Sequence, residues 1–268
     1  MQKESLWEQA QAAYCDGEYS QAEKYYNRLI SEEPQNLHAR IERQIIFQLQ
    51  ERREEAIQDL EHILKETIPL PESPSKNTAH IFDLQAEAYH WLAILHTRPP
   101  QDWEKALLYL DESIRVTEPL LDLLPQQALD RLSSIYMQRA QIFTAAENME
   151  HFALYELSRL FIILDLYEGE DFCQPEILHR ERQKAYLLQG ELHERKEQFF
   201  DATASYLNAG GYEGYKRAGT LSYNLGKTRR AGAYFRRALH EEHPLTEESQ
   251  CLWQILLGIE AAKRQMKS

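Results

Sequence analysis

The sequence predicts an all-α protein, a solenoid of about six helix pairs with a further helix covering its C-terminal end. Valine, which β-sheets favour, occurs only once, at Val116. The 10 glycines and 10 prolines fall mostly between segments of helical periodicity. A small residue followed four positions later by a bulky one recurs along the chain, which places both on one face of a helix. Together these observations favour stacked helices.

The recurring pattern is centred on five alanines. They are Ala22, Ala56, Ala106, Ala202 and Ala231, and the bulky residues that follow them are Tyr26, Leu60, Leu110, Tyr206 and Phe235. The first two alanines lie 34 residues apart. Self-similarity at such a period is typical of helical repeat proteins, in which each unit buries its apolar face against its neighbours.

This pattern resembles the tetratricopeptide repeat, a helix–turn–helix unit of 34 residues. The first repeat matches the family at Ala10, Tyr14, Tyr19, Ala22, Tyr26 and Pro34. The resemblance implies a right-handed superhelical solenoid, in which small residues let the first helix of each pair (helix A) approach the second (helix B) closely. Aromatic side chains then fill the space between neighbouring pairs.

The spacing of the alanines is uneven, and it predicts the following organisation of one continuous domain. Residues 1–70 form two regular repeats, 71–77 a proline-rich connector, 78–120 a third repeat with an insertion, 121–173 a degenerate fourth repeat, 174–245 the fifth and sixth repeats, and 246–268 a capping helix. In the capping helix Leu252, Ile255, Leu256 and Ile259 share one face. The apolar stretch from Phe161 to Tyr167 has two interpretations, a partner surface or part of the core.

The triplet Gly226-Lys227-Thr228 is how a phosphate-binding P-loop ends. A P-loop also needs a glycine five residues earlier and a buried strand before it, and Leu221 occupies the glycine position. The repeat pattern predicts instead that Gly226 lies in the turn between two helices, at the left-handed end of the first.

The formal net charge is −13, but it is unevenly distributed. Residues 174–268 contain 15 basic and 12 acidic residues, and the rest of the chain contains 15 and 31. This balance disfavours nonspecific nucleic-acid binding by the whole chain. Three scattered cysteines, no signal-peptide core and no apolar run long enough to span a bilayer predict a cytoplasmic protein without membrane contact.

No arrangement of nucleophile and base is evident in the sequence, so we expect no enzymatic activity, no catalytic residue and no cofactor. Two histidine patterns, His193-Glu194 and His240-Glu241-Glu242-His243, invite a metal interpretation. Neither supplies the three or four converging ligands that zinc requires, and we expect no metal.

The resemblance implies that helix A residues line a concave groove that holds peptides. The candidates carried over to this sequence are Trp7, Gln11, Ile41, Ile45, Gln48, His90, Ile94, Lys184 and Glu191. The Lys and Asn residues with which family members clamp a C-terminal carboxylate are missing from the first two repeats. We therefore expect a hydrophobic or basic protein segment as the ligand.

A basic patch is the second candidate surface. Its residues are Lys216, Arg217, Arg229, Arg230, Arg236 and Arg237. Three interpretations are open for it: a solvated helix face, a site for an acidic protein partner, or a site for phosphate or nucleic acid. The sequence thus favours a non-catalytic scaffold or adaptor for protein–protein interaction. The alternatives are a nucleic-acid-associated factor and a peptide-sensing regulator; the oligomeric state is not predicted.

Overall fold

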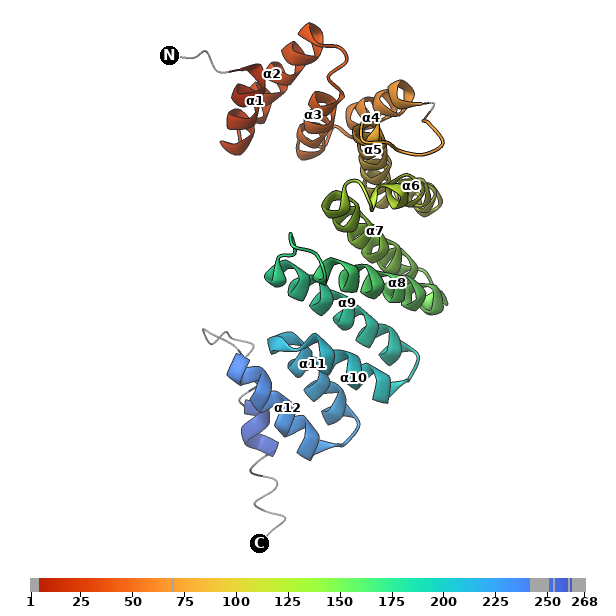
Figure 1. The fold of residues 1–268 in the computed structure, drawn as a ribbon. Helices are drawn as coiled ribbons and strands as arrows, with labels where there is room; N and C mark the ends of the chain where they lie inside the picture. The colour runs from red at the N-terminus through yellow and green to blue at the C-terminus, as the bar shows by residue number, and fades with distance from the viewer. Residues whose placement is uncertain (1–4, 69, 242–250, 253, 260, 262–268) are drawn as a thin grey trace. The chain divides into compact units, whose positions relative to one another are not determined.

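A computed structural model describes residues 5–68, 70–241, 251–252, 254–259 and 261. Within these ranges every regular element is a helix, as predicted, and the fold is an all-α helical solenoid (Figure 1). The chain divides into two compact units, with the boundary between Ile135 and Tyr136. Each unit is described by itself below.

The first unit contains three consecutive helix pairs. They are α1 (Leu6–Cys15) with α2 (Tyr19–Glu32), α3 (Leu37–Leu49) with α4 (Arg53–Thr67), and α5 (Ala79–Thr97) with α6 (Trp103–Thr117). A short 3-10 helix, η1 (Glu118–Leu120), follows, and then α7 (Pro125–Ala145), which crosses the boundary between the units. The helices of each pair pack against each other, and each pair packs on the next.

The second unit begins with the end of α7. It continues with α8 (Glu150–Glu168), α9 (Pro175–Arg195), α10 (Phe199–Ala209), α11 (Gly211–Asn224) and α12 (Thr228–Glu241). Helices α9 and α10 form one antiparallel pair, and α11 and α12 form another (Figure 1). None of the helices in the described ranges combines the length and hydropathy that a bilayer crossing requires.

The alanines of the repeat pattern lie at the centre of the packing, as predicted. All five have no exposed surface, and the bulky residues four positions later are at most 1% exposed. An alanine at each of these positions leaves room for the facing helix, and the larger side chain one turn later fills the space beside it. The residues of the sequence pattern therefore form the contact surface between helices.

Four helix pairs share one turn geometry. In the first, the N–H of Glu18 donates to the carbonyl of Ala13 at 2.8 Å, and the N–H of Gly17 donates to that of Tyr14 at 3.0 Å. The same two bonds recur at Glu51–Arg52, Glu197–Gln198 and Gly226–Lys227. This double bond pattern is the Schellman motif, which needs one residue in the left-handed region. Gly226 has a φ of +71°, so the predicted helix turn is confirmed.

Two later pairs are held by a glycine that faces an aromatic ring, Gly190 against Tyr206 and Gly219 against Phe235. A Cβ atom added at Gly219 would lie 2.5 Å from the Phe235 ring, which no real side chain tolerates. Glycine at these positions therefore sets the close approach of helix A to helix B.

The described part of the predicted capping helix packs on α12. Leu252 and Ile259 join Ala231, Phe235 and Ala238 in one core cluster. Leu256 is also buried, but Ile255, which the periodicity placed on the same face, is 41% exposed. The buried residues Leu252, Leu256 and Ile259 form a narrower stripe than the sequence pattern suggested, and Ile255 lies beside that stripe.

Candidate functional site

The α3 and α5 helices, both first helices of their pairs, pack side by side in the first unit. On α3, Glu42 and Ile45 lie one turn apart, and on α5 Glu87 and Ile94 lie two turns apart. All four side chains are half-buried. We call these residues, together with Trp91, the α3–α5 face.

The two carboxylates of this face influence each other. Burial raises the pKa of Glu42 above its usual 4.5, and the negative charge of Glu87 raises it further. Burial also raises the pKa of Glu87; the nearby Arg131 guanidinium opposes this effect but does not cancel it. The Trp91 indole N–H donates to Glu87 Oε1 at 3.4 Å. The α3–α5 face therefore holds two carboxylates that lack full compensation for their charge.

Neighbouring charges are better neutralised. Arg131 donates to Asp83 Oδ1 at 2.6 Å, and both side chains are mostly buried. In contrast, among the described residues Glu42 has no hydrogen-bond or ion-pair partner. A half-buried carboxylate without a partner carries a desolvation cost that a cationic ligand group would offset.

The prediction that Ile41 lines the groove is wrong. Ile41 is 3% exposed and belongs to the core cluster around Leu60 and Leu92, so no ligand can reach it. The predicted register is wrong by one residue at this position, because the side chain that reaches the surface is that of Glu42 and not that of Ile41.

The other candidates in the first unit lie at the surface to different degrees. Gln11 is exposed, and Ile45, Gln48, His90 and Ile94 are half-buried. Trp7 is half-buried because its indole packs edge-on against the Tyr26 ring, at 5.8 Å between ring centroids. Gln48 donates to the side-chain oxygen of the buried Gln44 at 2.5 Å.

A cavity of about 560 Å³ lies where α3 and α5 end. It is lined by Gln48, Leu49, Glu51, Arg53, Leu95, Arg98 and Pro99. Leu49 is 49% exposed there. Its lining combines apolar residues with four polar or charged ones, so the cavity is of mixed character.

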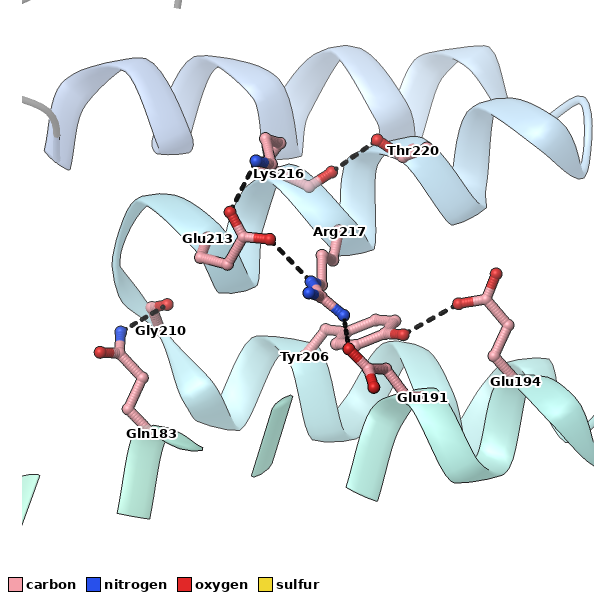
Figure 2. Close-up of polar contacts among 9 residues, drawn as sticks. All are labelled: Gln183, Glu191, Glu194, Tyr206, Gly210, Glu213, Lys216, Arg217 and Thr220. Carbon is pink, nitrogen blue, oxygen red and sulfur yellow. Dashed lines mark hydrogen bonds and ion pairs between the residues drawn. The ribbon is translucent and has the colours of Figure 1, made fainter. Parts of the chain in front are cut away.

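The second unit holds a dense polar network between α9, α10 and α11 (Figure 2). Arg217 donates to Glu213 at 2.7 Å and also contacts Glu191 of α9. Lys216 forms an ion pair with the same Glu213 at 2.6 Å. The carboxylate of Glu191, a predicted groove residue, is therefore already bound within the protein.

The network also fixes the protonation of its members. Burial raises the pKa of Glu213, but hydrogen bonds from Arg217 and Lys216 outweigh it, so the net pKa is lowered. Tyr206 donates its hydroxyl to Glu194 at 2.9 Å, and its pKa is raised, mainly by burial and then by that hydrogen bond. Because these charges compensate each other, the network acts as a cross-link between helices.

The predicted basic patch is two separate features. Lys216 and Arg217 lie on α11 and form the ion pairs just described, so the prediction that they belong to the basic patch is wrong. The four arginines Arg229, Arg230, Arg236 and Arg237 are exposed on α12. Sequence proximity grouped two sets that the turn at Gly226 places on different helices. Lys184, the remaining groove candidate, is exposed and pairs with Glu181 at 2.8 Å.

The stretch Phe161–Tyr167 divides between the two interpretations. Ile163, Leu164 and Tyr167 are buried, whereas Ile162 and Leu166 are 61% and 52% exposed. Phe152 and Tyr155 are exposed on the same helix, α8. This second apolar stripe was not predicted, although the seven-residue step from Tyr155 to Ile162 could have revealed it.

No group of three His, Cys, Asp or Glu side chains that could hold a metal ion occurs in the described ranges. Glu242 and His243 of the second histidine pattern lie outside the described residues.

Solved structures with a similar fold are known. BtubC (BKLC) from P. vanneervenii is 15% identical, with a TM-score of 0.58 over 91% of this chain and 96% of that chain. A signal transduction ATPase from Pyrococcus horikoshii that contains a tetratricopeptide repeat sensor is 20% identical, with a TM-score of 0.52 over 90% of this chain. The majority of the solved structures that this chain resembles are tetratricopeptide-repeat proteins.

The chain has the tetratricopeptide-repeat fold. It spans only 32% of the length of the Pyrococcus ATPase, so the likeness concerns the repeat array and not the whole enzyme. No protein-family model matches the sequence, and no curated protein sequence matches it either. Identities of 20% or less show the fold of these repeats, and a repeat fold does not specify a partner.

Proposed function

We propose that the chain is a non-catalytic tetratricopeptide-repeat scaffold that binds a segment of another protein on its α3–α5 face. Solenoids of this kind expose the same face of successive helices, which suits an extended ligand. The observation that carries the proposal is the half-buried carboxylate of Glu42, which has no partner among the described residues and lies close to Glu87.

The chemistry of the face favours one kind of segment. Ile45, Ile94 and Trp91 offer apolar contact, and Glu42 and Glu87 offer negative charge. A Lys or Arg side chain of the ligand would reach the two carboxylates and stabilise their charged forms, while an adjacent apolar residue would pack on the isoleucines. A segment with a basic and an apolar residue therefore fits this surface best.

The second unit is less suited to such a ligand. Glu191 and Glu213 are neutralised by Arg217 and Lys216, so a cationic ligand would have to displace existing ion pairs (Figure 2). We therefore assign ligand binding to the first unit and a structural role to the α9–α11 network.

Selection of phage-displayed random peptides on the purified protein tests the proposal. The selected peptides are then measured against a Glu42→Lys, Glu87→Lys variant. A matched control, Glu61→Lys, Glu104→Lys, makes the same charge change at exposed positions on α4 and α6. We expect peptides with Lys or Arg beside an apolar residue, bound about tenfold or more weakly by the first variant only, which corresponds to about 1.4 kcal/mol.

An equal loss in both variants would mean that net charge alone attracts the peptides. That result, or affinities that neither variant changes, would reject the α3–α5 face as the binding site. Circular dichroism of both variants confirms that each is folded.

A further inference from the structure

The exposed side of α12 carries two parallel rows of arginines. Arg229 and Arg236 form one row, and Arg230 and Arg237 form the other. Residues seven apart lie two turns apart on the same side of a helix, about 10.5 Å along its axis. Ala233 is exposed between the rows, so the centre of this surface is low and open. We call these five residues the α12 arginine face.

Basic residues outnumber acidic ones along α12. Between residues 225 and 241 only Glu241 is acidic, while Lys227 adds a fifth cation at the start of the helix. Arg237 is held in place because its guanidinium stacks on the Tyr215 ring of α11, at 4.6 Å from the ring centroid. The buried side of α12, which includes Ala231, Phe235 and Ala238, packs on the core, so the arginines are directed to solvent.

The placement of these charges opposes the electrostatics of the helix itself. Helix N-termini carry a partial positive charge and favour Asp or Glu in the first turn. Helices α1, α4, α6, α8, α9, α10 and α11 have one or two acidic residues there, whereas α2, α3, α5 and α7 have none. The first turn of α12 has none and holds Arg229 and Arg230 instead. This arrangement costs stability in the free protein, and an anionic ligand would remove the cost.

The charge of the whole chain limits what that ligand can be. At a net charge of −13, a long polyanion with many phosphates meets repulsion from the rest of the molecule. A protein segment with a few carboxylates meets much less, because its attraction comes from short-range charge-assisted contacts with the arginines. An α-helix repeats with the same pitch as α12, so carboxylates seven residues apart on it match the rows.

We propose that the α12 arginine face binds an acidic helical segment of a partner protein, with two carboxylates spaced seven residues apart facing each arginine row. The ligand lies along α12 over Ala233, where no bulky side chain blocks its approach. This surface is separate from the α3–α5 face and has the opposite charge preference, so the two sites select different segments.

The test uses a fluorescein-labelled helical peptide with two pairs of glutamates at seven-residue spacing, and the same peptide with glutamine at those positions. Binding is followed by fluorescence anisotropy over a range of salt concentrations. The variant Arg229→Gln, Arg230→Gln, Arg236→Gln, Arg237→Gln removes the rows. The control Lys24→Gln, Arg28→Gln, Arg115→Gln, Arg180→Gln makes the same change in net charge at exposed basic residues of other elements.

We expect the wild-type protein and the control to bind the glutamate peptide within about twofold of each other, and the α12 variant to bind it at least tenfold more weakly. The glutamine peptide should not bind. A milder variant, Arg229→Gln, Arg230→Gln, keeps the Tyr215 stack and should lose part of the affinity and reduce its dependence on salt. An equal loss in the control overturns the proposal.

Two further probes decide the class of partner. Duplex DNA and vesicles that contain phosphatidylserine are measured under the same conditions. Tighter binding of either than of the glutamate peptide, lost in the α12 variant, would show that the face serves phosphates and would reject an acidic protein segment.

Discussion

The ring of Tyr206 lies directly against the backbone of Gly190: a Cβ atom added to this glycine would be 2.4 Å from Cε1 of the tyrosine. The contact joins α9 to α10, and Tyr206 is 1% exposed. On an open helix surface, glycine is about 1 kcal/mol less favourable than alanine. Here the facing ring reverses that preference, because there is no room for a methyl group.

We therefore predict that Gly190→Ala destabilises the protein by about 1–3 kcal/mol, because the ring or the helix must move. Gly258→Ala is the matched control, since Gly258 is also helical and a Cβ atom added to it would have no neighbouring atom within 4 Å. That control should be neutral or slightly stabilising. Urea unfolding of both variants measures the difference, and equal effects would show that the close approach does not limit the packing.

The left-handed turn residues give a prediction with opposite signs at two equivalent positions. Gly226 and Glu197 have φ values of +71° and +58° in the same turn geometry. A side chain in this region costs roughly 1–2 kcal/mol, which glycine avoids. Gly226→Ala should therefore lower the melting temperature, and Glu197→Gly should raise it or leave it unchanged. A lower melting temperature in both variants would contradict the shared geometry.

A buried carboxylate ties three helices of the first unit together. Asp59 of α4 is 3% exposed and accepts hydrogen bonds from Arg40 and Arg43 of α3, the latter through both of its oxygens. Arg43 also donates to Asn27 of α2 at 2.6 Å.

Asp59→Ala leaves two arginines without their partner and should cost about 3 kcal/mol. Glu61→Ala, an exposed substitution on the same helix, should change stability by less than about 0.5 kcal/mol. Chemical denaturation of the two variants would contradict the prediction if their midpoints were the same.

The raised pKa of Glu42 predicts a dependence of stability on pH. The folded protein holds this proton more tightly than the unfolded chain, whose carboxyl titrates near 4.5. The contribution of Glu42 to stability is therefore highest below that pH, and it falls as the pH rises through the higher pKa of the folded state. Glu42→Gln should remove this loss, so that the variant gains stability relative to wild type as the pH increases. Parallel stability curves from pH-dependent unfolding would argue against the raised pKa.

The sequence predicted the helix packing well because that packing depends on local spacing. Ala22 with Tyr26 and Ala231 with Phe235 are one turn apart, and the structure buries both pairs. The turn at Gly226 was also predictable, since glycine is the residue that the left-handed position favours. Glu51 and Glu197 occupy the same position without glycine, and their turns are visible only in the structure.

The candidate site was less predictable because it depends on contacts between distant residues. Ile41 was predicted to face the groove but is buried, and its neighbour Glu42, which reaches the surface, was not predicted. The pairing of Glu191 with Arg217 joins residues 26 positions apart on different helices. A count of charges along the chain cannot show which of them neutralise one another.

Site-specific photo-crosslinking in cells tests the central claim most directly. A photoreactive phenylalanine analogue replaces Ile45 on the α3–α5 face, and, in a control, Leu108 on α6, which is 57% exposed. Our account predicts that Ile45 is crosslinked to one segment of another protein that contains a Lys or Arg next to an apolar residue, and that Leu108 is not. The same adducts from both positions, or adducts from Leu108 alone, would contradict it.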